Sequence, residues 1–245
     1  MVEISTLQKY SSSRTPAANY RGCLGYEDVI ERICQLPWTS LSGGELLAVA
    51  NSYYYFSIQF RENLQIACKL YPNDCKLKEL FVEECYTDNL SPWPGVAAAG
   101  ERLDHDEFMR RALSLQAVPS ADYLRLIGTS YLGRVRAVSD LARAKSIASY
   151  EDGGLSSVFM AILNAPCWEG AALQAFRFFL EQHVKFDSAI EGGHGALSRH
   201  LSPDGSILPL WLAFEDVLTR AAPPLAAARR EMVGEWQLSA IKQAG

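Results

Sequence analysis

The sequence predicts an all-α protein folded as a single-domain bundle of about seven to nine helices. Apolar residues recur at spacings of three and four through most of the chain, as they do along one face of a helix. No series of alternating apolar and polar residues indicates strands, and prolines or glycine-containing turns end the helical segments. With 245 residues, 49% of them hydrophobic, the chain is long enough to bury one substantial core.

The expected elements follow from where the periodicity starts and stops. Residues 1–24 are expected to form an N-terminal arm, and residues 25–245 the helical domain. Prolines end helices at Pro37, at Pro72 and in "SPWPG", because proline lacks the amide hydrogen that a helix interior needs. The stretches "APCWEG" and "SPDGS" make two further breaks. The expected helical segments are 25–36, 41–72, 73–90, 103–116, 120–133, 134–164, 169–198, 207–222 and 224–243.

Charge and composition exclude several classes of protein. A net charge of −5 argues against a general nucleic-acid binder, which needs a basic face to neutralise phosphates. No apolar run approaches the roughly 20 residues that span a bilayer, and the polar N-terminus lacks the apolar core of a signal peptide. The six cysteines form no CxxC pair, which indicates reduced thiols and a cytoplasmic location. No phosphate-binding glycine loop or nucleophile elbow is present.

The stretch "FFLEQHVKFDSAIEGGHGAL", residues 178–197, places polar residues on an apolar helical stripe. Burying such groups is unfavourable unless they are hydrogen-bonded, paired or bound to a metal. Two plainer alternatives remain open: a surface helix whose polar side begins at His183, or histidines bonded to backbone carbonyls. The residues of this stripe are Phe176, Phe179, Leu180, His183, Asp187, Ile190, Glu191 and His194.

Two other helical segments carry a glutamate where the pattern predicts an apolar residue. Glu84 is in register with Leu77, Leu80 and Phe81, and Glu151 lies at the centre of the stripe in segment 134–164. Each alone could be an amphipathic residue near a helix end. Together with the histidine-bearing helix, they predict ligands that converge inside a bundle. Mixed carboxylates and imidazoles without cysteine favour iron or manganese over structural zinc.

These motifs resemble those of the haem-oxygenase-like di-iron oxidases and oxygenases, whose relatives include TenA-like and CADD-like proteins. That family has glutamates on an early and a middle core helix, and a late helix with the pattern His-x-x-x-Asp-x-x-His. Here "EECYTD" supplies Glu84, "ASYEDGG" supplies Glu151, and "EQHVKFDSAIEGGHG" supplies His183 and Asp187. The resemblance covers roughly residues 45–225. It implies a haem-oxygenase-like bundle with two Fe(II) ions per chain and O2 as co-substrate.

The sequence departs from the family pattern at two points. The late helix has Ile190 where the second histidine is expected, and Glu191 and His194 are the candidates to complete the ligand set. No histidine follows Glu84 closely, since His105 is 21 residues further on. The "DHDEF" stretch that contains His105 is interpreted as an acidic helix start. Two glycines before His194 would also soften a helix, so one metal position is expected to bind weakly.

The resemblance implies an oxygenase or oxidase acting on a small amino-acid-like substrate. One branch of the family forms nitriles from tryptophan derivatives in natural-product biosynthesis. The alternative is a metal-free TenA-like protein that binds or hydrolyses a small molecule. No nucleic-acid or membrane partner is expected, and the sequence leaves open whether the chain forms a homodimer.

The segment "NSYYYFSIQFREN" carries the candidate substrate-binding residues. Tyr54 and Tyr55 could form a pocket wall for an aromatic substrate, and Arg61 could pair with its carboxylate. Ordinary aromatic core packing is the favoured alternative for the tyrosines. Glu62 falls on the stripe of Tyr54 and Tyr55 and is a reserve metal ligand.

Overall fold

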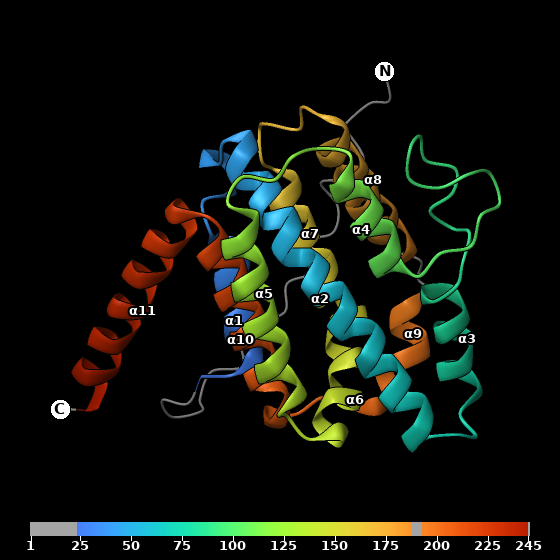
Figure 1. Ribbon diagram of the computed structural model, residues 1–245. Coiled ribbons are helices and arrows are strands. Elements are labelled where there is room, and N and C mark those ends of the chain that lie inside the picture. Colours follow the sequence, from blue (N-terminus) through green and yellow to red (C-terminus); the bar gives the residue numbers. More distant parts are fainter. Residues whose placement is uncertain (1–23, 188–192, 245) are drawn as a thin grey trace, which may run out of the picture.

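The computed structural model describes residues 24–187 and 193–244. Within these residues the protein is all-helical and forms one bundle, which confirms the predicted fold class (Figure 1). The described part contains more helices than the seven to nine expected, because segments predicted as single helices are divided. Two isolated β-bridges, Thr87–Leu103 and Trp93–Ala97, are the extended pairings found among these residues.

The long helix α2 (Gly43–Leu70) forms the centre of the bundle. It begins with a capping box, in which Ser42 Oγ accepts from the Glu45 amide and Glu45 Oε2 accepts from the Ser42 amide. Helices α3, α4, α5, α6, α8 and α10 all pack against α2, so much of its surface is buried. A helix surrounded in this way needs apolar residues on most of its faces.

The N-terminal helix is fastened to the C-terminal half by a buried ion pair. Helix α1 (Tyr26–Gln35) packs on α10 (Leu208–Ala221). Arg32 donates two hydrogen bonds of 2.8 Å to Glu215, whose side chain is fully buried. Helix α11 (Pro223–Ala244) follows α10 and extends away from the rest of the bundle (Figure 1).

Helix α3 (Cys75–Glu84) is shorter than the predicted segment 73–90. Cys85 has extended backbone angles, and the chain then forms the connection 85–104. Thr87 and Leu103 exchange backbone hydrogen bonds of 3.1 and 2.9 Å, which close this connection upon itself. Helix α4 (His105–Ser114) starts directly after it and packs against α8.

The predicted helix 134–164 is divided by a π-helical turn. Helix α6 (Asp140–Ser149) leads into η3 (Tyr150–Gly154), and α7 (Leu155–Leu163) follows. Gly153 has φ of 92°, a left-handed conformation that costs little for glycine but strains other residues. The "EDGG" sequence thus interrupts the regular helix where the apolar periodicity alone predicted continuity.

The predicted helix 169–198 is also divided. Helix α8 (Ala171–Asp187) and the short α9 (His194–Ser198) are separated by a segment that includes residues 188–192, outside the described residues. The remaining helical elements are α5 (Ala121–Arg136), η2 (Trp38–Ser40), η4 (Arg199–Leu201) and η5 (Gly205–Ile207).

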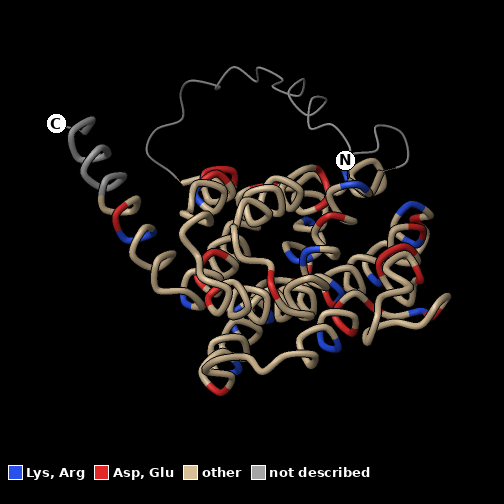
Figure 2. Tube along the Cα trace, turned by 90° about the horizontal axis from the view of Figure 1, so that it is seen from above, with Lys and Arg blue, Asp and Glu red and all other residues tan. Residues whose placement is uncertain are grey.

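Acidic and basic residues are interspersed over the described helices (Figure 2). Among the residues that the structure describes, no helix combines the length and the apolar character needed to cross a membrane.

Candidate metal centre

One group of buried potential ligands is formed by Glu84, His105 and His183. Glu84 is the last residue of α3, His105 the first of α4, and His183 lies in α8. His105 Nδ1 is 2.8 Å from Glu84 Oε2 and 3.1 Å from His183 Nε2. The ligand atoms of these three residues all lie within 4.8 Å of one another, so they could hold one metal ion.

A second group shares Glu84 and adds Glu151 and His194. His194 Nδ1 is 3.0 Å from Glu84 Oε1 and 3.1 Å from Glu151 Oε2. Glu84 therefore directs one carboxylate oxygen toward each group. All five side chains are buried, although they come from α3, α4, η3, α8 and α9.

Local backbone features bring the second group together. Glu151 lies in the π-helical turn η3, a type of irregularity that is frequent at functional sites. His194 starts α9, and the next residue is Gly195. A Cβ atom at Gly195 would lie 3.0 Å from the Glu151 carbonyl oxygen, so any larger residue would push α9 and η3 apart by a few tenths of an ångström.

The donor set fits a metal ion. His183 Nδ1 lies 2.7 Å from the Phe179 carbonyl oxygen, which only accepts, so Nδ1 carries the hydrogen. The neutral ring then presents the lone pair of Nε2 to His105 and Glu84. Glu84 Oε1 is buried and lies 3.0 Å from His194 Nδ1. Carboxylate oxygens and imidazole nitrogens that converge in a buried site are ligands that a cation can hold together in place of protons.

The buried charges strongly perturb one another in the metal-free protein. Burial alone would raise the pKa of Glu84, but its contacts with His105 and His194 hold it well below its usual value. Burial raises the pKa of Glu151. Burial would lower the pKa of His194, but the Glu84 and Glu151 carboxylates raise it to about 12. Burial lowers the pKa of His183 to about 3, which keeps this imidazole neutral.

A narrow cavity adjoins the first group. Tyr53, Phe56 and Phe60 of α2 and Phe179 of α8 form apolar parts of its wall, and Glu84, Glu151, His105 and His183 line it as well. The Phe179 ring stacks on His183, with centroids 4.0 Å apart. The metal-ligand candidates thus face an apolar space.

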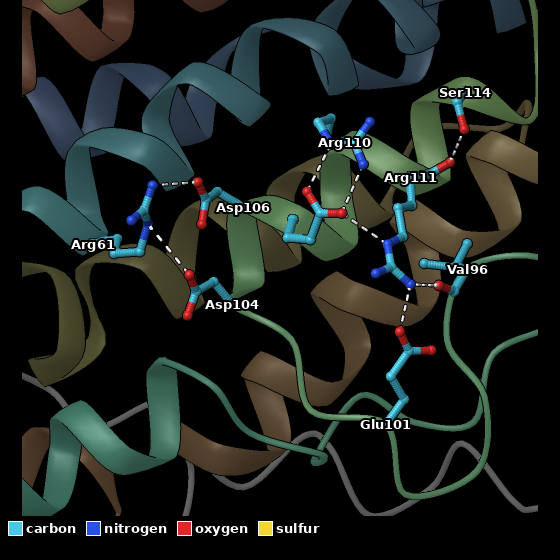
Figure 3. A network of polar contacts seen from close by, with 9 residues as sticks. Arg61, Val96, Glu101, Asp104, Asp106, Arg110, Arg111 and Ser114 are labelled. Carbon is cyan, nitrogen blue, oxygen red and sulfur yellow. Dashed lines mark hydrogen bonds and ion pairs between the residues drawn. The ribbon is translucent and has the colours of Figure 1, made fainter.

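Arg61 also lines this cavity, close to the start of α4. Its Nη2 donates a 2.8 Å hydrogen bond to Asp106 Oδ2, and its Nε lies 3.9 Å from Asp104 Oδ2 (Figure 3). The Arg61 side chain is 31% exposed. Burial raises the pKa of its partner Asp106.

The structure places the other predicted substrate residues elsewhere. Tyr54 and Tyr55 do not line the described cavity. Tyr55 packs over Gly128 of α5, where an added Cβ would come within 2.2 Å of the ring. Glu62 binds Arg136 and Arg143, and does not belong to either ligand group. Tyr53 and Phe56, on the next face of α2, take the wall positions.

The structure brings Glu84, Glu151, His183 and His194 together from the predicted ligand set. Asp187 is the last residue of α8, one turn after His183, but its side chain lies outside the described part of the chain. Glu191 also lies outside the described residues.

His105 was interpreted from sequence as part of a structural helix start, yet it belongs to the first ligand group. The signal was present: His105, Phe108, Met109 and Ala112 share one helical stripe, and all are buried. The same argument that selected His183 applies to His105.

No protein-family model, no curated protein and no solved structure matches this chain.

Proposed function

We propose that this protein is an O2-dependent non-haem di-iron oxidoreductase. The observation that carries the proposal is the position of Glu84 between two ligand groups, with one oxygen directed toward each. His105 and His183 would help hold one iron, and Glu151 and His194 the other. Carboxylates mixed with imidazoles suit iron or manganese, and helical bundles hold di-iron centres with such ligands. Bound iron would supply the redox chemistry with O2.

The protein's own residues supply position and surroundings. Phe179 packs against His183 and restricts its ring, while the Phe179 carbonyl fixes its tautomer. Tyr53, Phe56 and Phe60 keep the adjoining cavity apolar, which limits the access of water to a reactive centre. These features support an oxidation of a bound organic molecule next to the ligand groups.

The direct test is anaerobic loading with Fe(II), followed by measurement of iron content and O2 consumption. We expect two iron ions per chain and O2 uptake that depends on them. His183→Ala and Glu151→Ala should each abolish that uptake and retain a helical circular dichroism spectrum. His200→Ala is a matched control, because His200 pairs with Asp74 at the surface. A parent protein that binds no iron would overturn the proposal and favour the metal-free TenA-like alternative.

For the substrate, we propose a small amino acid with an aromatic side chain, such as a tryptophan derivative, with nitrile formation among its possible reactions. Arg61 supports this class, since its Nε is buried and makes no hydrogen bond within the described residues. A substrate carboxylate could therefore bind the guanidinium alongside Asp106. Its side chain would enter between the aromatic residues of α2 and α8 and displace them, because the cavity is narrow.

Arg61→Ala should weaken binding of tryptophan at least tenfold in a spectral or thermal-shift titration, and leave iron content unchanged. Arg134→Ala serves as the control, since Arg134 pairs with Asp216 at the surface. A long-chain fatty acid that outcompetes every aromatic amino acid would contradict this choice of substrate.

A further inference from the structure

Two of the candidate ligand histidines, His105 and His194, have a polar partner at the ring nitrogen that faces away from the ligand groups. His105 Nε2 lies 3.1 Å from Asn89 Oδ1. His194 Nε2 lies 3.1 Å from Glu83 Oε2. In both rings the opposite nitrogen, Nδ1, faces Glu84. Neither Asn89 nor Glu83 belongs to a ligand group.

The orientation of the Asn89 amide follows from its other contacts. Its Nδ2 donates a 2.9 Å hydrogen bond to the Glu83 carbonyl, and its backbone amide donates to Thr87 Oγ1 at 3.3 Å. The amide oxygen must then face His105. Because that oxygen only accepts, His105 Nε2 carries a hydrogen. When the ring is neutral, its lone pair is at Nδ1.

Glu83 acts on His194 in an analogous way. A carboxylate accepts the hydrogen of Nε2, so the lone pair of the neutral ring is again at Nδ1. Glu83 directly precedes Glu84 at the end of α3, and the side chain is 39% exposed while that of Glu84 is buried. Glu83 therefore reaches His194 from the solvent side, and Glu84 from the inside.

We propose that Glu83 and Asn89 are positioning residues that make His194 and His105 bind metal through Nδ1. His183 differs, since its Nδ1 donates to the Phe179 carbonyl and leaves Nε2 for the metal. This inference rests on the proposed metal centre. It assigns a function to the connection 85–104, which places Asn89 beside His105 by folding back at the Thr87–Leu103 bridge. Outer hydrogen bonds of this kind orient ligating imidazoles and increase their basicity.

The first test identifies the ligating nitrogens in the full chain loaded with Zn2+, a diamagnetic probe. Long-range ¹H–¹⁵N NMR spectra distinguish a protonated from a metal-bound ring nitrogen. We expect metal-bound Nδ1 in His105 and His194, and metal-bound Nε2 in His183. Coordination of His105 or His194 through Nε2 would overturn the inference. A protein that binds no Zn2+, Co2+ or Fe2+ would instead remove the proposed metal centre itself, so the two failures are distinguishable.

The second test measures Co2+ affinity by competition with a chelator. Asn89→Leu and Glu83→Leu each remove an acceptor and should weaken binding by about 10- to 100-fold. Asn89→Asp and Glu83→Gln keep an acceptor oxygen and should lose much less. Asp88→Asn and Glu79→Gln are controls, since both residues are exposed neighbours on the same connection and helix.

The comparison between the two variants at each position decides the result. If the leucine variant and the variant that keeps an acceptor lose the same Co2+ affinity, the positioning role is overturned. The loss would then come from a general disruption of the local structure. Parent-like Co2+ affinity in Asn89→Leu and Glu83→Leu would overturn it as well. If a leucine variant at one position fails to fold, the other position and the NMR assignment still decide.

Discussion

Glu84 is a single residue on which both ligand groups depend. Its two oxygens face different histidines, and its burial is tolerated because it pairs with His105 and His194. The residues of the two groups are not equivalent, however, since His105 and His183 belong only to the first. Substitutions at these positions should therefore affect one metal ion more than the other.

His105→Ala should reduce metal content from two ions to one per chain after anaerobic loading with Fe(II). The remaining ion would be held by Glu84, Glu151 and His194. Metal analysis of the gel-filtered protein measures the change, and His200→Ala should retain both ions. Two ions bound by His105→Ala with parent affinity would show that His105 is not a ligand.

Glu62 illustrates a partly buried charge that serves stability. Burial would raise the pKa of Glu62, but the hydrogen bonds and charges of Arg136 and Arg143 lower it. A carboxyl group with a lowered folded-state pKa stabilises the fold above its unfolded pKa, and this stabilisation is lost as the pH falls through the folded-state value. The affected range thus lies on the acidic side of neutrality.

Glu62→Gln should lower the free energy of unfolding at pH 7 by about 1–3 kcal/mol, since Arg143 stays buried without its carboxylate partner. The difference from the parent should shrink as the pH falls below about 4. Urea unfolding at several pH values measures both effects. Glu181→Gln, at an exposed ion pair with Arg177, should change stability by no more than about 0.5 kcal/mol at any pH.

At the scale of elements, apolar periodicity predicted most helices but not their interruptions. Glu84 and Glu151 were selected because they lie on apolar stripes, and each lies at a helix end or break. The contact between Glu84 and His105, at the two ends of the connection 85–104, could not be predicted. Sequence separation does not show how a loop folds back. Tyr53 lines the cavity and the adjacent Tyr54 does not. Periodicity alone does not determine the rotation of α2 about its axis that decides between them.

The η3 turn can be tested through its glycine. Gly153→Ala should destabilise the protein by about 1–2 kcal/mol, because alanine is strained at a φ of 92°. It should also weaken metal binding, since Glu151 belongs to the same turn. Gly133→Ala is the opposite control: Gly133 lies in α5 with open space around it, and alanine should stabilise the helix by up to about 1 kcal/mol. Thermal and urea unfolding compare the two variants. Equal stability of both would contradict a strained turn.

At the scale of the whole molecule, the ligand groups join elements that are far apart in the sequence. Glu84 and His105 flank the 85–104 connection, while Glu151, His183 and His194 belong to the second half of the chain. A metal that binds only the folded arrangement stabilises all of these elements together.

Addition of Mn2+ or Fe2+ at about 100 times its dissociation constant should therefore increase stability by about 2.7 kcal/mol. For a chain of this size, the melting temperature should rise by roughly 5–10 °C. A chelator should reverse the shift, and Glu84→Gln should abolish most of it. An unchanged melting temperature at saturating metal would show that the folded state has no preferential affinity for the ion.

The two ions should bind with unequal affinity, because both groups depend on the same carboxylate. Once one divalent cation occupies either group, Glu84 has already neutralised part of that charge, and the second cation is repelled by the first. Protein isolated without added iron should thus contain fewer than two ions per chain. A Mn2+ titration followed by isothermal calorimetry should show two phases, the second weaker by tenfold or more. His183→Ala should remove one phase and leave the other. Two equal, chelator-resistant sites in untreated protein would contradict the sharing of Glu84.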